Sequence, residues 1–144
     1  MNITSEDLLA LMRARLPTSV PLRLPPPCLT EMQAEPMEFV DGVSLTMRFP
    51  VLERWQNPLG YMQGGFIVAA LDNTMGPFSY LIAPPSVTGQ LGISYLRPVV
   101  PQMRWLTCTA RLVERTAKTL YLAGEARGDD GKTIAICQST CPLV

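Results

Sequence analysis

The chain has 144 residues, a length typical of one domain and sufficient to bury a hydrophobic core without disulfides or bound metals. Hydrophobic residues make up 47% of it and charged residues 17%, which is the composition of a folded globular chain and excludes a disordered one. Twelve basic residues balance twelve acidic ones without a basic cluster, so we expect no nucleic-acid partner.

The first predicted element is a short amphipathic helix. Thr4 and Asp7 have the spacing of a capping box, which marks a helix start. The apolar face of this helix consists of Leu8, Leu9, Met12 and Leu16. Five prolines between Pro17 and Pro27 then predict an extended, non-helical connector. We therefore divide the chain into an N-terminal helix with a proline-rich connector, residues 1–27, and a main domain, residues 28–144.

The main domain is expected to begin with strands, because the pattern becomes strand-like from Cys28. Asp41-Gly42 is a hairpin-type turn signal. After this turn apolar and polar residues alternate, which predicts a half-buried strand. The apolar positions of that strand are Val43, Leu45, Met47 and Phe49. The segment from Pro50 to Pro58 is predicted to be a loop.

One long helix is predicted from Gly64 to about Ala83. Its residues are apolar on nearly every side, which is typical of a helix buried in the centre of a fold. Pro84 and Pro85 end it, and Pro77 predicts a kink or a break within it.

The remainder of the chain is predicted to be sheet. Alternating patterns cover residues 91–95, 106–112, 120–126 and 134–138, and the last two are joined by a turn at 128–132. Strands, one buried helix and a series of long strands indicate the α+β class, with one antiparallel β-sheet wrapped around a central helix.

The chain contains no histidine, and this limits its chemistry. Ser-His-Asp and Cys-His nucleophiles and histidine zinc sites are excluded. Acid–base catalysis must then use carboxylates, tyrosines, water or the only two lysines, Lys118 and Lys132. The four cysteines form no C-x-x-C pair, so we expect buried thiols without disulfides or metal. Without a signal peptide or an apolar run of about 18 residues, we expect a cytoplasmic protein without membrane contact.

Two features of the long helix suggest a reaction site. Gly64 and Gly65 open the helix, where free N–H groups and the helix dipole stabilise a developing oxyanion. Asp72 is an isolated carboxylate in the most apolar helix, where burial is costly unless it has a function. The structural alternatives are tight helix packing for the glycines and, for Asp72, an internal hydrogen bond to Asn73, Thr74 or the backbone.

The segment from Asn57 to Gly65, together with Asp72, resembles the hotdog-fold acyl-CoA thioesterases, in particular their PaaI-like (phenylacetic-acid-pathway) branch. That branch has an asparagine, a glycine, His-Gly-Gly and then an aspartate on the same helix. The asparagine and aspartate spacings match here, but Gln63 stands in place of the histidine. The resemblance spans roughly residues 38–140 and includes the segments 92–98, 118–120 and 130–132.

The resemblance implies a role for each matching residue. Gly64 would donate its amide to the thioester oxygen, with help from Asn57, and Asp72 would be the catalytic carboxylate. Thr88 would hold water by its hydroxyl. Gln63 cannot transfer protons, so it either replaces a structural imidazole or marks a branch of weakened activity. For Asn57, the structural alternative is a cap on the turn before Pro58.

The spacing between Gly64 and Asp72 predicts an obligate homodimer, provided that both groups act on one substrate. Eight residues of helix rise about 12 Å, so one thioester cannot reach both groups of the same chain. Antiparallel helices across a two-fold axis would bring Gly64 of one subunit to Asp72 of the other. The family assembles its sites in this way, and we expect two such dimers to pair.

The function expected from this resemblance is hydrolysis of an acyl-CoA to a carboxylic acid and free CoA. The acyl group would enter the apolar subunit interface, and Gly65 would allow close approach of the substrate. The CoA phosphates would meet surface cations, namely Arg97, Arg127 and Lys132. Coenzyme A would be part of the substrate, and no metal or cofactor is implied.

Two other functions compete with this one on the same fold. One is a non-catalytic acyl-CoA-binding protein, which Gln63 favours because it replaces the histidine. The other is a hydratase or dehydratase of acyl thioesters, which in this family uses a histidine paired with a carboxylate. The absence of histidine argues against it.

Overall fold

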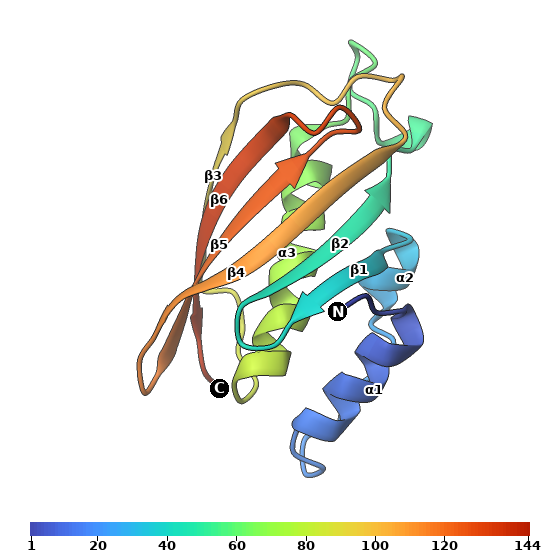
Figure 1. Cartoon of the computed structure of the whole chain (residues 1–144). Coiled ribbons are helices and arrows are strands. Elements are labelled where there is room, and N and C mark those ends of the chain that lie inside the picture. Colours follow the sequence, from blue (N-terminus) through green and yellow to red (C-terminus); the bar gives the residue numbers. More distant parts are fainter.

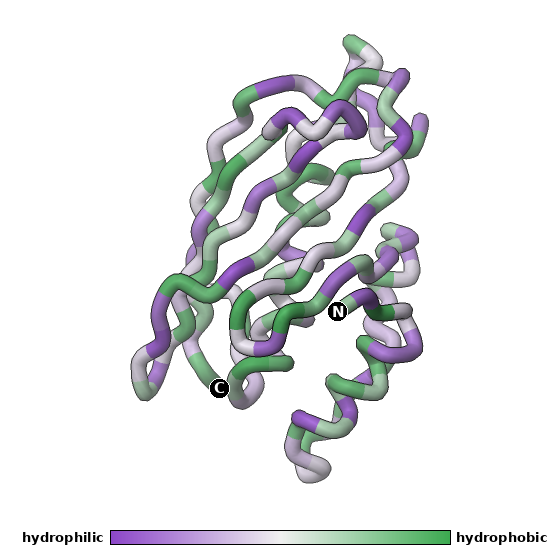
Figure 2. Tube along the Cα trace, viewed as in Figure 1, coloured by the Kyte–Doolittle hydropathy of each residue, from purple (hydrophilic) through white to green (hydrophobic).

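The computed structural model describes all residues 1–144. Its main element is a single antiparallel sheet. Its strands, in the spatial order β1-β2-β4-β5-β6-β3, are β1 (Glu35–Val40), β2 (Ser44–Pro50), β3 (Gln90–Tyr95), β4 (Trp105–Arg115), β5 (Thr119–Arg127) and β6 (Thr133–Pro142). Figure 2 shows hydrophilic and hydrophobic residues alternating along these strands, because one face of the sheet is covered and the other is open.

The central helix α3 (Gly64–Ile82) lies across the covered face of the sheet, as the sequence predicts (Figure 1). Its inward side chains, among them Leu71, Met75 and Phe78, are almost fully buried against the strands. Gly124 on β5 permits this close packing, because an added Cβ would lie 2.7 Å from Cys137 Sγ and 3.3 Å from Leu71. The helix continues through Pro77 without a break.

Two shorter helices lie beside the β1 end of the sheet (Figure 1). The first is α1 (Ser5–Arg15), and the second is α2 (Pro27–Glu31). The capping box of α1 is confirmed, since the Thr4 hydroxyl accepts from Asp7 N–H and the Asp7 carboxylate accepts from Thr4 N–H. At the other end of α1, Arg15 binds Asp41 at 2.8 Å and donates to the carbonyl of Leu81, which fastens the helix to the β1–β2 hairpin and to α3.

The prediction of strand structure from Cys28 is wrong. Cys28 lies in α2, which begins at Pro27, a residue whose fixed φ suits the first turn of a helix and whose missing N–H costs nothing there. The first strand begins only at Glu35. The Asp41-Gly42 hairpin is confirmed, with Gly42 at φ 71°, whereas Val43 is exposed and lies just before β2.

The two edges of the sheet differ. The edge formed by β1 is covered by the first residues of the chain, because Ile3 N–H donates to Met37 and Phe39 N–H donates to Met1. The edge formed by β3 pairs only with β6 and carries no strand on its other side. None of the helices combines the length and the hydrophobicity that a membrane span requires.

The cysteines are all free, in agreement with the expectation of no disulfide. Cys108, Cys137 and Cys141 are buried, and burial raises the pKa of each thiol, to about 11 for Cys137. Cys28 was also expected to be buried, but it is exposed.

Substitution of Thr4 by alanine tests the capping box. The variant should melt about 2–4 °C below the wild type, because the first turn of α1 loses its cap. Hydrogen bonds from Thr4 lower the pKa of Asp7, so this stabilisation is present at neutral pH and is lost as the pH falls through that lowered pKa. The control is Ser5→Ala, whose side chain makes no hydrogen bond. Equal melting temperatures of Thr4→Ala and wild type would contradict the assignment.

A thiol titration tests the burial of the cysteines. At pH 8 a chromogenic disulfide reagent should modify one thiol per chain, Cys28, before unfolding and all four after it. The variant Cys28→Ser should show no rapidly reacting thiol. Rapid reaction of a second cysteine in the folded protein would show that the core is open.

Candidate active site

The N-terminus of α3 presents one free backbone amide. Gln63 is the N-cap residue, and its side-chain Oε1 accepts from the N–H of Gly65 at 2.9 Å. The backbone N–H of Gln63 donates to Trp55, which fixes the entry to the helix. The N–H of Gly64 has no acceptor within the chain. Gly64 is therefore the donor that an anionic or developing negative charge can meet at the positive end of the helix.

Asn57 both caps a turn and keeps a donor available. Its side-chain oxygen accepts from Leu59 N–H at 2.9 Å and from Tyr61 N–H at 3.1 Å. These two bonds fix the carboxamide, and its Nδ2 makes no hydrogen bond within the chain and is not buried. The predicted structural role of Asn57 is thus present, and it leaves the NH₂ group free to bind an oxygen atom.

Asn57 and Gly64 line the same shallow cavity, together with Tyr95 and Arg97. The Tyr95 hydroxyl donates to the carbonyl of Gly64 at 2.7 Å, and burial raises the pKa of Tyr95, so that it remains a donor at neutral pH. Tyr95 was not among the residues expected from the sequence. Its place at the end of an alternating strand gave no signal that its hydroxyl reaches the first turn of the helix.

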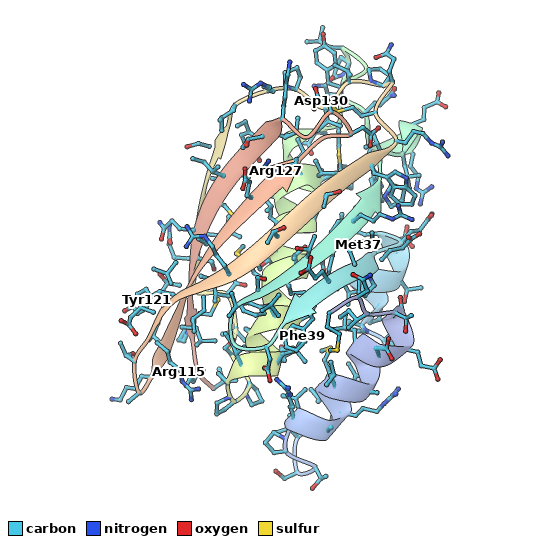
Figure 3. The ribbon with its side chains drawn as sticks, in the orientation of Figure 1. Met37, Phe39, Arg115, Tyr121, Arg127 and Asp130 are labelled. Carbon is cyan, nitrogen blue, oxygen red and sulfur yellow. The ribbon has the colours of Figure 1, made fainter.

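Of the three cations expected to bind phosphates, Arg97 lies at this cavity. Its guanidinium donates to the carbonyl of Thr133 at 2.7 Å and has no acidic partner. Lys132, the neighbour of Thr133, is exposed on the turn between β5 and β6. Arg127 at the end of β5, beside the turn that carries Asp130 (Figure 3), is paired with Glu125 at 3.0 Å and does not line the cavity.

Asp72 lies two turns further along α3, where it is half-buried. The Thr88 hydroxyl donates to Asp72 Oδ1 at 2.8 Å. The expected alternative partners are engaged elsewhere, since Asn73 donates to the carbonyl of Ala69 and Thr74 to that of Ala70. The side-chain partner of the Asp72 carboxylate is therefore Thr88, sixteen residues away in the sequence.

Asp72 and Thr88 line a second cavity of about 380 Å³, between α3 and the proline-rich connector. Neither Asn57 nor Gly64 lines it. Within one chain, the free donors of Asn57 and Gly64 and the carboxylate of Asp72 thus open into separate cavities, in agreement with the 12 Å of helix expected between Gly64 and Asp72. No group of three or more cysteine, aspartate or glutamate side chains could hold a metal ion.

The connector residues of this second cavity, among them Leu22 and Leu24, were not expected to be near a functional group. Their apolar side chains in a proline-rich segment were the signal available in the sequence. An extended segment has no periodic pattern that shows which of its sides is buried. The sequence therefore could not show which part of the domain the connector covers.

Three solved structures illustrate what the chain resembles. The conserved protein PA5202 from Pseudomonas aeruginosa is 27% identical, with 81% of this chain and 92% of that chain covered and a TM-score of 0.73. The E. coli PaaI protein from the phenylacetic acid degradation operon is 16% identical over 95% of this chain and 96% of its own, with a TM-score of 0.81. The protein smu.793 from Streptococcus mutans, bound to acetyl CoA, is 21% identical, with 76% of this chain and 86% of that chain covered and a TM-score of 0.71.

These similarities confirm the predicted hotdog fold. A search among curated proteins finds no match. A family model described as "Thioesterase superfamily" matches residues 59–135, which include Gly64, Asp72 and Thr88. Because this match spans more than half of the chain, the protein belongs to the thioesterase superfamily and is a thioester hydrolase.

Proposed function

We propose that the protein hydrolyses acyl-CoA thioesters to a carboxylic acid and free CoA, at sites shared between the two subunits of a homodimer. The observation that carries the proposal is that the groups proposed to react lie in two separate cavities of each chain. A free donor pair, Asn57 Nδ2 and Gly64 N–H, lines one cavity, and the Asp72 carboxylate, held by Thr88, lines another. One cavity therefore lacks a carboxylate and the other lacks the donor pair, so a complete site needs one cavity from each subunit.

In the proposed reaction the thioester oxygen accepts hydrogen bonds from Gly64 N–H and Asn57 Nδ2. These donors stabilise the negative charge that develops when the carbonyl carbon is attacked, typically by about 3 kcal/mol for one donor. Asp72 either takes a proton from an attacking water or attacks the carbon itself to give an anhydride, which water then hydrolyses. In both routes the C–S bond breaks and the CoA thiolate leaves and takes up a proton.

The open edge of the sheet supports the dimer. Strand β3 has no partner on its outer side, and Tyr95 and Leu96 at its end are half exposed although they are large and apolar. Ile136 on the neighbouring strand is exposed to the same extent. Pairing of β3 with its copy across a two-fold axis would satisfy the free backbone groups and bring the two α3 helices together.

The CoA moiety is assigned to the cavity of Gly64 and Arg97. Arg97 is an unpaired cation at its rim, and Lys132 follows on the adjacent turn, so both can meet phosphate oxygens. The structure of the S. mutans protein with acetyl CoA supports this class of ligand. We leave Arg127 out of this assignment, because Glu125 already neutralises it.

One observation favours a non-catalytic acyl-CoA-binding protein as the second candidate. The Gln63 side chain is engaged in capping α3 and cannot transfer a proton, so no group at that position assists the leaving thiolate. Under this alternative the chain binds acyl-CoA at the same residues and releases it unchanged.

The variant Asp72→Asn tests the role of the carboxylate. We expect kcat to fall by about 10²–10⁴-fold, because the amide neither accepts a proton nor forms the anhydride, while the affinity for acyl-CoA changes little. Release of free CoA from a panel of acyl-CoAs measures the rate, and calorimetry measures binding. The matched control is Glu6→Gln on the exposed face of α1, which should keep full activity. Equal turnover by Asp72→Asn and wild type would remove Asp72 from the mechanism.

Tight binding of acyl-CoA without hydrolysis by the wild type would select the second candidate, the non-catalytic acyl-CoA-binding protein.

Mixing two inactive variants tests the shared site. Asn57→Asp keeps the oxygen that caps the turn but removes the donor and adds a negative charge where the oxyanion forms, so it should be inactive. A dimer of one Asn57→Asp and one Asp72→Asn subunit has one site with both defects and one intact site. Refolding the two variants together at equal amounts should restore about one quarter of the wild-type activity, since about half of the dimers are mixed. If each site lay within one chain, mixing would restore nothing.

A further inference from the structure

A glycine inside α3 is not explained by packing. Gly76 follows Asp72 by one helical turn, so the two residues share a face of the helix. Glycine within a helix costs about 1 kcal/mol relative to alanine. Apart from its chain neighbours and the helix backbone, an added Cβ at Gly76 would meet no atom within 4 Å, so packing against other elements does not require a glycine there. The following Pro77 is a local reason for it, because a Cβ before a proline disfavours the helical conformation. What Gly76 does provide is empty space beside the carboxylate, in the cavity that it lines.

The wall opposite Gly76 comes from the N-terminal part of the chain. The proline-rich connector contributes Leu22, Leu24 and Pro26, and α1 contributes Met12. Leu22 is 37% exposed although it is a large apolar residue, so its side chain is available to a ligand in the cavity. Val87 lies on the same cavity, next to Thr88.

Of the polar side chains that line this cavity, the serines and Cys28 are already bonded within the chain, whereas Arg23 on the exposed connector forms no ion pair. Ser86 donates to Ser79, and Ser79 donates to the carbonyl of Gly76. The Cys28 thiol donates to Asn73 at 3.2 Å. A ligand that enters therefore meets a mainly apolar surface, with the Asp72–Thr88 pair on α3 and the unpaired Arg23 on the connector as its polar parts.

We propose that this cavity is the acyl-binding pocket and that Gly76 and the connector set the size of the acyl group. The inference rests on the proposed function. It places the acyl group within one subunit, between α3 and the N-terminal arm, and not in the subunit interface expected from the sequence. The volume, about 380 Å³, is at the small end of ligand pockets, about 300–1,000 Å³. The substrate class is therefore a compact, mainly apolar acyl group, such as a medium-length aliphatic chain or a single aromatic ring.

Substitutions on the two walls test this pocket in opposite directions. The ratio of kcat/KM for hexanoyl-CoA to that for acetyl-CoA is measured, and the same ratio is measured for phenylacetyl-CoA. Gly76→Leu fills the pocket and should lower both ratios by about tenfold or more, with Gly76→Ala between it and the wild type. Leu24→Ala removes part of the opposite wall and should raise the ratio of decanoyl-CoA to hexanoyl-CoA. The control is Val43→Ala, an exposed change at the distant hairpin that should alter neither ratio.

Melting temperatures and CoA affinities distinguish a change in acyl specificity from misfolding and from loss of CoA binding. Gly76→Ala should melt close to wild type, because the helix propensity of alanine is offset by the contact of its Cβ with Pro77. Unchanged acyl ratios in folded Gly76→Leu would overturn the inference. So would an equal loss of affinity for free CoA and for acyl-CoA, since that would place the pantetheine arm in the cavity. If the wild type hydrolyses no acyl-CoA, the proposed catalysis fails. In that case, calorimetry on the same variants still tests the pocket. Gly76→Leu should lose affinity for hexanoyl-CoA and keep its affinity for free CoA.

Discussion

The fixed rise of one α-helix is the constraint on which the rest of this molecule depends. Helix α3 carries both the free amide of Gly64 and the carboxylate of Asp72, and packing against the sheet keeps it rigid. No side-chain rotation can close the distance between them, and they open into different cavities. The chemistry proposed here therefore depends on a second copy of the chain, so that assembly and catalysis would be lost together.

The start of α3 shows how a neutral residue serves where the resemblance implies histidine. Gln63 takes the amide of Gly65 as a capping partner, and this leaves the amide of Gly64 as the free donor of the first turn. Tyr95 holds the carbonyl of Gly64 from the other side. Both of these contacts lie on the Gly64–Gly65 peptide, while the carbonyl of Gln63, which shares a peptide with the Gly64 N–H, accepts from Phe66 and Ile67. The peptide that carries the free N–H and the one after it are thus both fixed, which is what a pre-organised oxyanion donor requires.

The fold and the places of Asn57, Gly64 and Asp72 within it could be predicted from the sequence, but the partners of these residues could not. The alternation of the strands and the apolar length of α3 have strong periodic signals, and the Asn57, Gly64 and Asp72 spacing is local. The bond from Thr88 to Asp72, the reach of Tyr95 and the connector wall all depend on contacts between distant segments. The helix at Cys28 was missed because only a single turn forms there, and so short an element has no measurable period.

The covered edge of β1 has a consequence for how far assembly can go. The first three residues occupy the backbone groups of that strand, and β3 is left as the one edge that can accept another strand. An association that uses identical edges across a two-fold axis then consumes both open edges and closes. Pairing of two unlike edges, β1 of one copy with β3 of the next, would not close in this way, and residues 1–3 oppose it by occupying backbone groups of β1.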